Sequence, residues 1–294
     1  MVEAHVNLKA LRHNAEIARQ LAPHSRLMAV VKANAYGHGL LRVAQALSRS
    51  VDGFAVARWE EALELRRGGI RSRLLVLSSL LANEQFEQAA AEAIELVIHD
   101  ADSAVRLSHC ALSRPVTVWL KVDTGMHRLG LNPDHAVEIA TRLRDCGSVA
   151  DLILMSHFAS ADEPDNPFTG RQLASLERVN ATLNAPLSVA NSAAIIGHAQ
   201  SHRAWIRPGI MLYGANPLGE AAAPRLQAVM TLRSKLLAVR SISAGEWVGY
   251  NQTWQSSRPT RIGTIAAGYG DGYPRHARPG TPVLINGRRV PLVG

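Results

Sequence analysis

Short apolar runs alternate with amphipathic helical patterns from Arg26 onward, and this alternation most constrains the fold. A helical segment, or a turn leading into one, follows each run, and such alternation is typical of parallel βα units. Eight units within about 210 residues favour a closed (β/α)8 barrel of the TIM type over an open doubly wound sheet. No G-x-G-x-x-G follows an early strand to support a dinucleotide site. The expected strands are Arg26–Ala33, Gly53–Ala57, Leu74–Leu77, Glu95–Ile98, Val116–Val122, Leu152–Met155, Leu187–Ala190 and Ala204–Ile206.

The pattern changes after about Gly219, where long helical periodicity ends and short strand-like runs separated by turns begin. We therefore predict an α/β protein with a barrel domain over residues 1–218 and a second, mainly β domain over residues 219–294. The expected strands of the second domain are Leu232–Arg240, Glu246–Tyr250, Arg261–Ala267, Pro282–Ile285 and Arg289–Val293.

Composition narrows the class of protein. A chain of 294 residues with 47% hydrophobic and 19% charged residues is typical of soluble globular proteins. Its apolar runs are too short to span a membrane. The net charge of +8 comes without a basic tail or a basic run interleaved with aromatics. We expect no nucleic-acid partner and no membrane partner, whereas an anionic small substrate would suit the charge.

The cysteine count and the first residues of the chain bear on its location. Cys110 and Cys146 form no CxxC pair and no disulfide framework. Met1 to Leu11 already carry charged residues, so no secretory signal is visible. We expect a cytoplasmic protein.

A single lysine, Lys32, closes the first apolar run and enters a glycine-rich turn. Burial of an unpaired ammonium is costly, so Lys32 either has a partner or performs chemistry such as Schiff-base formation with an aldehyde cofactor. The alternative is a lysine that ends a strand and points to water. The stretch alone does not decide between them.

Other polar residues follow the later strands, and in a barrel the loops after the strands share one face. They are Lys121 to Arg128, Ser156-His157, Asn191-Ser192 and Arg207 to Ile210. They contain no plausible metal-ligand set and no obvious Ser-His-Asp set. They suit pyridoxal phosphate instead: Lys32 would hold the aldehyde, Arg207 would face the pyridine nitrogen, and Ser192 with the backbone N–H groups near Gly209 and Ile210 would bind phosphate.

These segments together resemble the bacterial alanine racemases, which depend on pyridoxal 5'-phosphate and have fold type III. The matching segments run in family order and are far more specific than any one motif. They are Ala29 to Gly39, Lys121 to Gly130, Ser156 to Ala159, Asn191-Ser192, Arg207 to Gly214, Val248-Gly249-Tyr250 and Gly268 to Gly272.

The resemblance implies two-base racemisation of L-alanine and D-alanine, which supplies or consumes D-alanine for peptidoglycan. Lys32 would carry the cofactor and act as one base, and Tyr250 would be the opposite base, contributed by the partner in a head-to-tail homodimer. Because a free tyrosine titrates near ~10, Tyr250 would need a cationic neighbourhood from His157 and Arg207.

The same resemblance implies roles for the remaining site residues. Arg128 would lie near the cofactor phenolate and the substrate carboxylate. Lys121 matches a lysine that is often carbamylated in the family, and it would hold Arg128 in place. Phosphate and cofactor contacts would come from Tyr36, Asn191, Ser192, Gly209 and Ile210, with His157 linking Tyr250 to Arg207. Tyr269, Arg275 and Asp162 would line the substrate corridor.

The family normally continues past Val293-Gly294 and there supplies further contacts to the partner's active site. We therefore expect an incomplete second domain, weaker dimerisation and reduced or absent activity for this chain. Three alternative functions remain: a non-catalytic pyridoxal-phosphate homeostasis protein, which would lack the second domain and its tyrosine; a broad-specificity amino-acid racemase; and a decarboxylase sharing the barrel.

Overall fold

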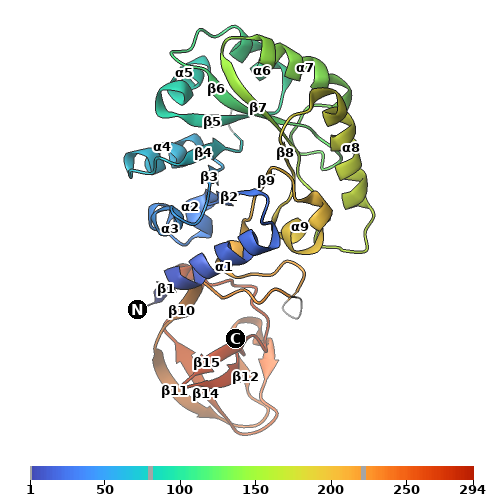
Figure 1. The fold of residues 1–294 in the computed structure, drawn as a ribbon. Helices are drawn as coiled ribbons and strands as arrows, with labels where there is room; N and C mark the ends of the chain where they lie inside the picture. The colour runs from blue at the N-terminus through green and yellow to red at the C-terminus, as the bar shows by residue number, and fades with distance from the viewer. Residues whose placement is uncertain (1, 79–81, 220–222) are drawn as a thin grey trace. The chain divides into compact units, whose positions relative to one another are not determined.

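The computed structural model describes residues 2–78, 82–219 and 223–294 (Figure 1). It divides into two compact units. The first comprises Val6–Val229, and the second comprises Met230–Gly294 together with the N-terminal segment up to His5. Among the described residues, none of the helices has the length and apolar character needed to cross a membrane.

The first unit is a closed barrel in which neighbouring strands pair in parallel and the last strand pairs with the first. Closure is made by Arg26 opposite Trp205 and Leu27 opposite Ile206. The predicted eight-stranded barrel is thus confirmed. The strands are β2 (Arg26–Val30), β3 (Gly53–Val56), β4 (Arg73–Val76), β5 (Ile94–Ile98), β6 (Val116–Lys121), β7 (Val149–Met155), β8 (Leu187–Ser188) and β9 (Trp205–Ile206).

Helices cover the outside of the barrel, and several begin at a side chain that satisfies free backbone N–H groups (Figure 1). Asn7 caps the helix that starts at Leu8, Asp100 caps the helix that starts at Ala101, and Asn132 caps the helix that starts at Pro133. The outer helices are α1 (Leu8–Leu21), α3 (Leu40–Leu47), α4 (Trp59–Arg67), α5 (Asn83–Glu92), α6 (Ala101–Ser108), α7 (Pro133–Asp145), α8 (Phe168–Leu183) and α9 (Ser192–Gly197).

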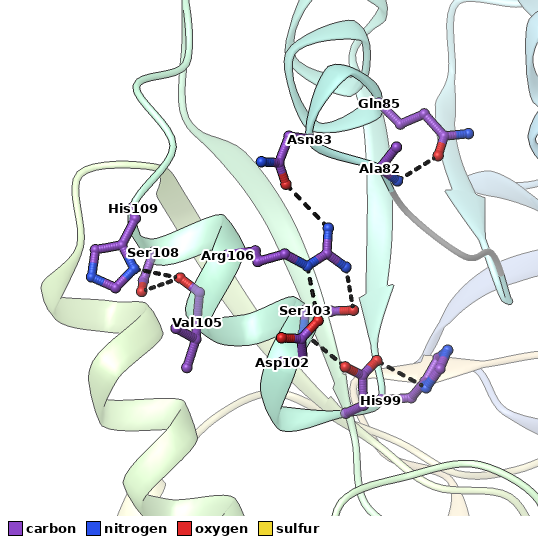
Figure 2. A network of polar contacts seen from close by, with 11 residues as sticks. Ala82, Asn83, Gln85, His99, Asp102, Ser103, Val105, Arg106, Ser108 and His109 are labelled. Atoms are coloured by element: carbon purple, nitrogen blue, oxygen red, sulfur yellow. Dashed lines mark hydrogen bonds and ion pairs between the residues drawn. The ribbon is translucent and has the colours of Figure 1, made fainter.

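Polar contacts join neighbouring helices on the outer ring, as Figure 2 shows for α5 and α6. The Arg106 guanidinium on α6 donates to Asp102 Oδ2 at 2.9 Å and to Asn83 Oδ1 on α5 at 3.1 Å. It also lies 5.6 Å from the centre of the Phe86 ring. The side chain thus covers the buried aromatic ring while its charge stays paired.

Side chains fill the barrel interior, so the barrel is a packed core and not a pore. Among the barrel strands, Trp119 Nε1 donates to Glu95 Oε2 at 2.6 Å, and the Arg73 guanidinium donates to the other carboxylate oxygen. The inner core consists of Met28, Val30, Ala55, Leu75, Val97, Trp119, Ile153, Met155 and Trp205.

The second unit is rich in short antiparallel strands, as predicted. The short strand β13 (Trp254–Gln255), which pairs with β12 (Trp247–Val248), was not predicted. Two further differences concern the start of the unit. The first is an unexpected strand, β1 (Glu3–Val6), which pairs with β10 (Met230–Arg233). The second is that the strand expected over Leu232–Arg240 is interrupted. Its first part pairs with β1, whereas β11 (Leu236–Ile242) pairs with β14, so the chain bends between them. The other strands are β12 (Trp247–Val248), β13 (Trp254–Gln255), β14 (Thr260–Ile265), β15 (Pro282–Ile285) and β16 (Arg288–Pro291).

Candidate functional site

Four of the basic residues predicted for the site lie at the carboxyl ends of barrel strands. Lys32 follows β2, Lys121 is the last residue of β6, His157 follows β7 and Arg207 follows β9. These side chains lie close enough to affect one another's ionisation, as does Arg128 from the connection after β6. The barrel topology therefore gathers five basic groups at the carboxyl ends of its strands.

The turn that follows Lys32 is unusual. The strand expected over Arg26–Ala33 ends at Val30, and residues Ala33 to Tyr36 form a left-handed turn with φ between 53° and 54°. For residues with a Cβ this conformation costs roughly 1–2 kcal/mol each. Surrounding contacts must therefore hold the turn in place.

Several of those contacts come from residues near the turn. His38 Nδ1 donates to the carbonyls of Ala35 and Tyr36 at 3.0 and 2.9 Å. The Tyr36 ring stacks on Tyr213 with centroids 4.7 Å apart, and the Tyr213 hydroxyl donates to the Val30 carbonyl at 3.2 Å. The turn is thereby fastened to the strand that precedes it.

Arg207 is the most deeply buried cation of the site, with 3% of its surface exposed. Its guanidinium donates to Ser188 Oγ at 2.5 Å, to the Ser156 carbonyl at 2.6 Å and to His157 Nδ1 at 3.4 Å. Burial lowers the pKa of Arg207 to about 10, which leaves it charged at neutral pH. Since arginine has no acceptor, His157 Nδ1 must be the unprotonated ring nitrogen.

The positive charges lower one another's pKa values. Burial, followed by Arg207 and Arg128, lowers the pKa of Lys121 to about 8. Burial, followed mainly by Arg207 and Lys121, holds the pKa of His157 well below its ordinary value. His157 is therefore neutral at pH 7, where the sequence predicts that it and Arg207 together form a cationic neighbourhood. The cation of that pair is the arginine.

A small-residue cradle lies beside these charges. Ser192 Oγ accepts from the backbone N–H groups of Gly209 at 2.9 Å and of Met211 at 3.2 Å. A Cβ on Gly209 would meet the Tyr36 hydroxyl oxygen at 2.7 Å, so only glycine leaves that hydroxyl in place. Asn191 Oδ1 accepts from Ala194 N at 3.0 Å and so caps α9.

The donor set of this mouth fits pyridoxal 5'-phosphate. A primary amine, Lys32, can bond an aldehyde, and its pKa is lowered by burial and then by Arg128. Hydroxyl and backbone N–H donors beside Gly209 can hold a phosphate. A dianionic ligand would also relieve the mutual repulsion of the basic groups. Within the described ranges, no group of three or more His, Cys, Asp or Glu could hold a metal ion.

The remaining predicted residues belong to different parts of the chain. Tyr250 and Tyr269 belong to the second unit and are 81% and 68% exposed, and the Arg275 guanidinium lies 5.9 Å from the centre of the Tyr269 ring. Asp162 is an exposed residue of the barrel unit. Ile210 N follows Gly209 in the cradle, and the Ile210 side chain is 39% exposed.

Three residues that position the site were not expected from the sequence. Ser188 accepts a hydrogen bond from Arg207, and Tyr213 donates one to the Val30 carbonyl. Glu61 accepts one from the turn after Lys32. Glu61 had a visible signal, because it lies at the third position of a helix, where a glutamate often accepts from the N-cap backbone. Tyr213 lies in the segment Arg207 to Gly214 that carries the family resemblance, but its bond to Val30 and the role of Ser188 had no signal, since only the closed barrel brings them to their partners.

Two family descriptions match the chain. Residues 6–217 match the family described as "Alanine racemase, N-terminal domain", and residues 229–294 match "Alanine racemase, C-terminal domain". The chain belongs to the alanine racemase family. Two relatives called alanine racemase, from Shewanella sp. (strain ANA-3) and Shewanella baltica (strain OS195), are 48% and 49% identical over 294 residues. Each alignment covers 99% of this chain and 82% of the relative.

Solved structures of the racemase family share the fold. The biosynthetic alanine racemase of Pseudomonas aeruginosa is 44% identical, with a TM-score of 0.93, and the match covers 100% of this chain and 82% of that one. The alanine racemase of Bartonella henselae, solved with covalently bound pyridoxal phosphate, is 30% identical with a TM-score of 0.86. That match also covers 100% of this chain and 82% of that chain. The family uses pyridoxal phosphate, in agreement with the donor set at the mouth of the barrel.

Proposed function

We propose that this alanine racemase interconverts L-alanine and D-alanine with two bases, Lys32 and Tyr250, on opposite faces of the substrate. The observation that carries this assignment is the convergence of Lys32, Lys121, Arg128, His157 and Arg207 beside the Gly209 cradle. Racemisation requires removal of the α-proton on one face and its return on the other. Two fixed bases achieve this without any rotation of the substrate.

Each base has a stated atom. Bound pyridoxal 5'-phosphate supplies the electron sink that acidifies the α-proton of the attached amino acid. Lys32 Nζ would hold the cofactor when substrate is absent and exchange the proton on one face. Its lowered pKa makes the neutral amine more available than that of an ordinary lysine. Tyr250 Oη would exchange the proton on the other face.

Tyr250 needs its pKa lowered to act as a base, and the Arg207–His157 pair provides a route. Arg207 donates to His157 Nδ1, so Nε2 carries the ring proton and can donate to a phenolate oxygen. Arg207 would also face the pyridine nitrogen and, as a donor only, would leave that nitrogen unprotonated. The charge that stabilises the phenolate would then be that of Arg207.

We further propose a head-to-tail homodimer in which each Tyr250 serves the barrel of the partner. The Tyr250 side chain is 81% exposed and follows Gly249, which has a φ of +79°. A phenol presented in this way is available to a second molecule. Leu237 and Trp247, at 70% and 50% exposed, add apolar surface to the same unit.

The remaining assignments are also proposals. Tyr36, Ser192, Gly209 and Ile210 would hold the phosphate, with Asn191 shaping the loop beside it. Arg128 and Tyr269 would bind the substrate carboxylate. A cytoplasmic location, a role in peptidoglycan supply, and domain limits of 1–218 and 219–294 stay predictions.

The direct test is conversion of L-alanine to D-alanine by the cofactor-loaded chain, with serine, lysine and arginine assayed in parallel. Preference for alanine supports the proposal, whereas similar rates on all four substrates favour a broad-specificity racemase. Cofactor binding without turnover favours a homeostasis protein. The measured rate on L-alanine also tests the prediction that this chain has reduced or absent activity.

Gly209→Ala should weaken cofactor binding by roughly tenfold, which corresponds to about 1.4 kcal/mol. The added Cβ would displace the Tyr36 hydroxyl, which lies 2.7 Å away, from the phosphate cradle. Titration of the cofactor by absorbance measures the effect. Gly170→Ala is a matched control because a Cβ there meets nothing within 4 Å. Equal affinity in the two variants would contradict the assignment of Gly209.

Lys121 should take up carbon dioxide as pH rises through 8. Carbamylation requires the neutral amine, and the pKa of about 8 makes half of Lys121 neutral near that pH, whereas an ordinary lysine stays charged. The new negative charge would then lie beside Arg128 and Arg207. With ¹³C-labelled bicarbonate, a carbamate NMR signal should grow with pH and vanish in Lys121→Met. A signal that survives this substitution would belong to another amine.

A further inference from the structure

We propose that Glu61 is a positioning residue for the reaction: its carboxylate joins the left-handed turn behind Lys32 to the start of α4 and places a negative charge toward the Lys32 amine. The inference rests on the proposed role of Lys32. Glu61 lies on an outer helix, α4, and neither the sequence motifs nor the cofactor contacts gave it a role.

The carboxylate of Glu61 bonds two separate segments. Oε2 accepts from the backbone N–H groups of Ala57 and Arg58, both at 3.1 Å, which is an ordinary capping arrangement at the start of α4. Oε1 accepts from Asn34 N at 3.2 Å. Asn34 lies in the middle of the left-handed turn, 27 residues earlier in the chain, so a helix cap alone does not explain this contact.

The turn needs such a contact on that side. Asn34 has a φ of +54°, and its own Oδ1 accepts from Leu40 N at 2.8 Å, so its side chain is bonded toward α3. His38 and Tyr213 support the later part of the turn and the strand before it. Glu61 thereby holds the backbone N–H of Asn34, two residues after Lys32. Displacement of that backbone would move the amine that must reach the substrate.

Glu61 also acts on Lys32 through its negative charge. The titratable groups coupled to Lys32 come from four elements: Glu61 from α4, Arg128 from the loop after β6, Lys121 from β6 and the neutral His157 from the loop after β7. Arg128 lowers the pKa of Lys32 and Glu61 raises it. Asp123, the other carboxylate nearby, instead bonds the N–H groups of Gly125 and His127. Glu61 thus limits how far the surrounding cations depress the basicity of Lys32.

The test compares Glu61→Gln and Glu61→Asp with Glu60→Gln, an exposed neighbour in the same first turn of α4. The cofactor is removed from the 294-residue chain, and the rate at which Lys32 recaptures it is followed by absorbance across a range of pH. Capture needs the neutral amine. Loss of the carboxylate lowers the pKa of Lys32, so the midpoint should move to lower pH in Glu61→Gln and stay at the wild-type position in Glu60→Gln.

Two further readouts separate positioning from a merely structural role. Glu61→Gln should lower kcat for alanine by roughly tenfold through the displaced turn. Glu61→Asp keeps the charge but is too short to bond both segments, so its pH midpoint should stay closer to wild type while kcat falls. An unchanged midpoint in Glu61→Gln would overturn the inference and leave Glu61 as a helix cap. Failure of the wild-type chain to capture the cofactor through Lys32 would instead contradict the proposed function.

Discussion

Lys32→Ala abolishes racemisation, with an expected loss of about 10⁴-fold or more in kcat/KM. The substitution removes the amine that holds the cofactor and one of the two bases, and no neighbouring residue can replace both. Lys121 belongs to the same group of basic residues, but it lies at the end of β6, whereas Lys32 lies at the start of the turn after β2. Steady-state assays in both directions measure the loss, and borohydride reduction followed by peptide mass analysis locates the attached cofactor.

The control for this substitution is Lys9→Ala on α1, where the side chain is exposed. It removes one positive charge from the barrel unit and should leave activity unchanged. Fold retention in both variants is checked by circular dichroism. If Lys32→Ala keeps activity near that of Lys9→Ala, or if the cofactor is found on another lysine, the assignment of Lys32 is wrong.

Much of the barrel could be predicted because each strand carries its own local signal. The run around Leu74–Leu77 is apolar, short and followed by a helical pattern, so its state depends little on the rest of the chain. Lys32, Lys121, His157 and Arg207 could be identified for the same reason, since each lies at or just after the end of such a run. Parallel topology then places them at one end of the sheet.

Features that depend on contacts far along the chain could not be predicted in this way. The segment from Glu3 to Val6 is exposed along most of its length and becomes a strand only because β10 pairs with it. The left-handed turn after Lys32 is disfavoured locally for residues such as Ala33 and persists through tertiary contacts. The neutral state of His157 likewise follows from burial beside Arg207, which no motif records.

Tyr250→Phe should lower kcat by roughly 10²–10⁴-fold while leaving cofactor binding intact. Phenylalanine keeps the ring but has no hydroxyl to exchange a proton, so only the Lys32 face of the substrate remains reactive. In D₂O, exchange of the α-proton should persist for one enantiomer of alanine and be lost for the other. Tyr273→Phe, in the same unit, is the control and should behave like the unsubstituted chain. Loss of exchange for both enantiomers, or for neither, would contradict a one-face role for Tyr250.

Mixing the two inactive variants decides whether Tyr250 acts on its own chain or on the partner. If Lys32 and Tyr250 of different molecules share a site, a mixed dimer of Lys32→Ala and Tyr250→Phe has one doubly defective site and one intact site. Random exchange makes half of the dimers mixed, so activity should return to about a quarter of that of the unsubstituted chain. If both bases came from one molecule, every site would lack one of them and mixing would restore nothing. Unfolding and refolding the variants together, then separately as a control, distinguishes the two arrangements by activity alone.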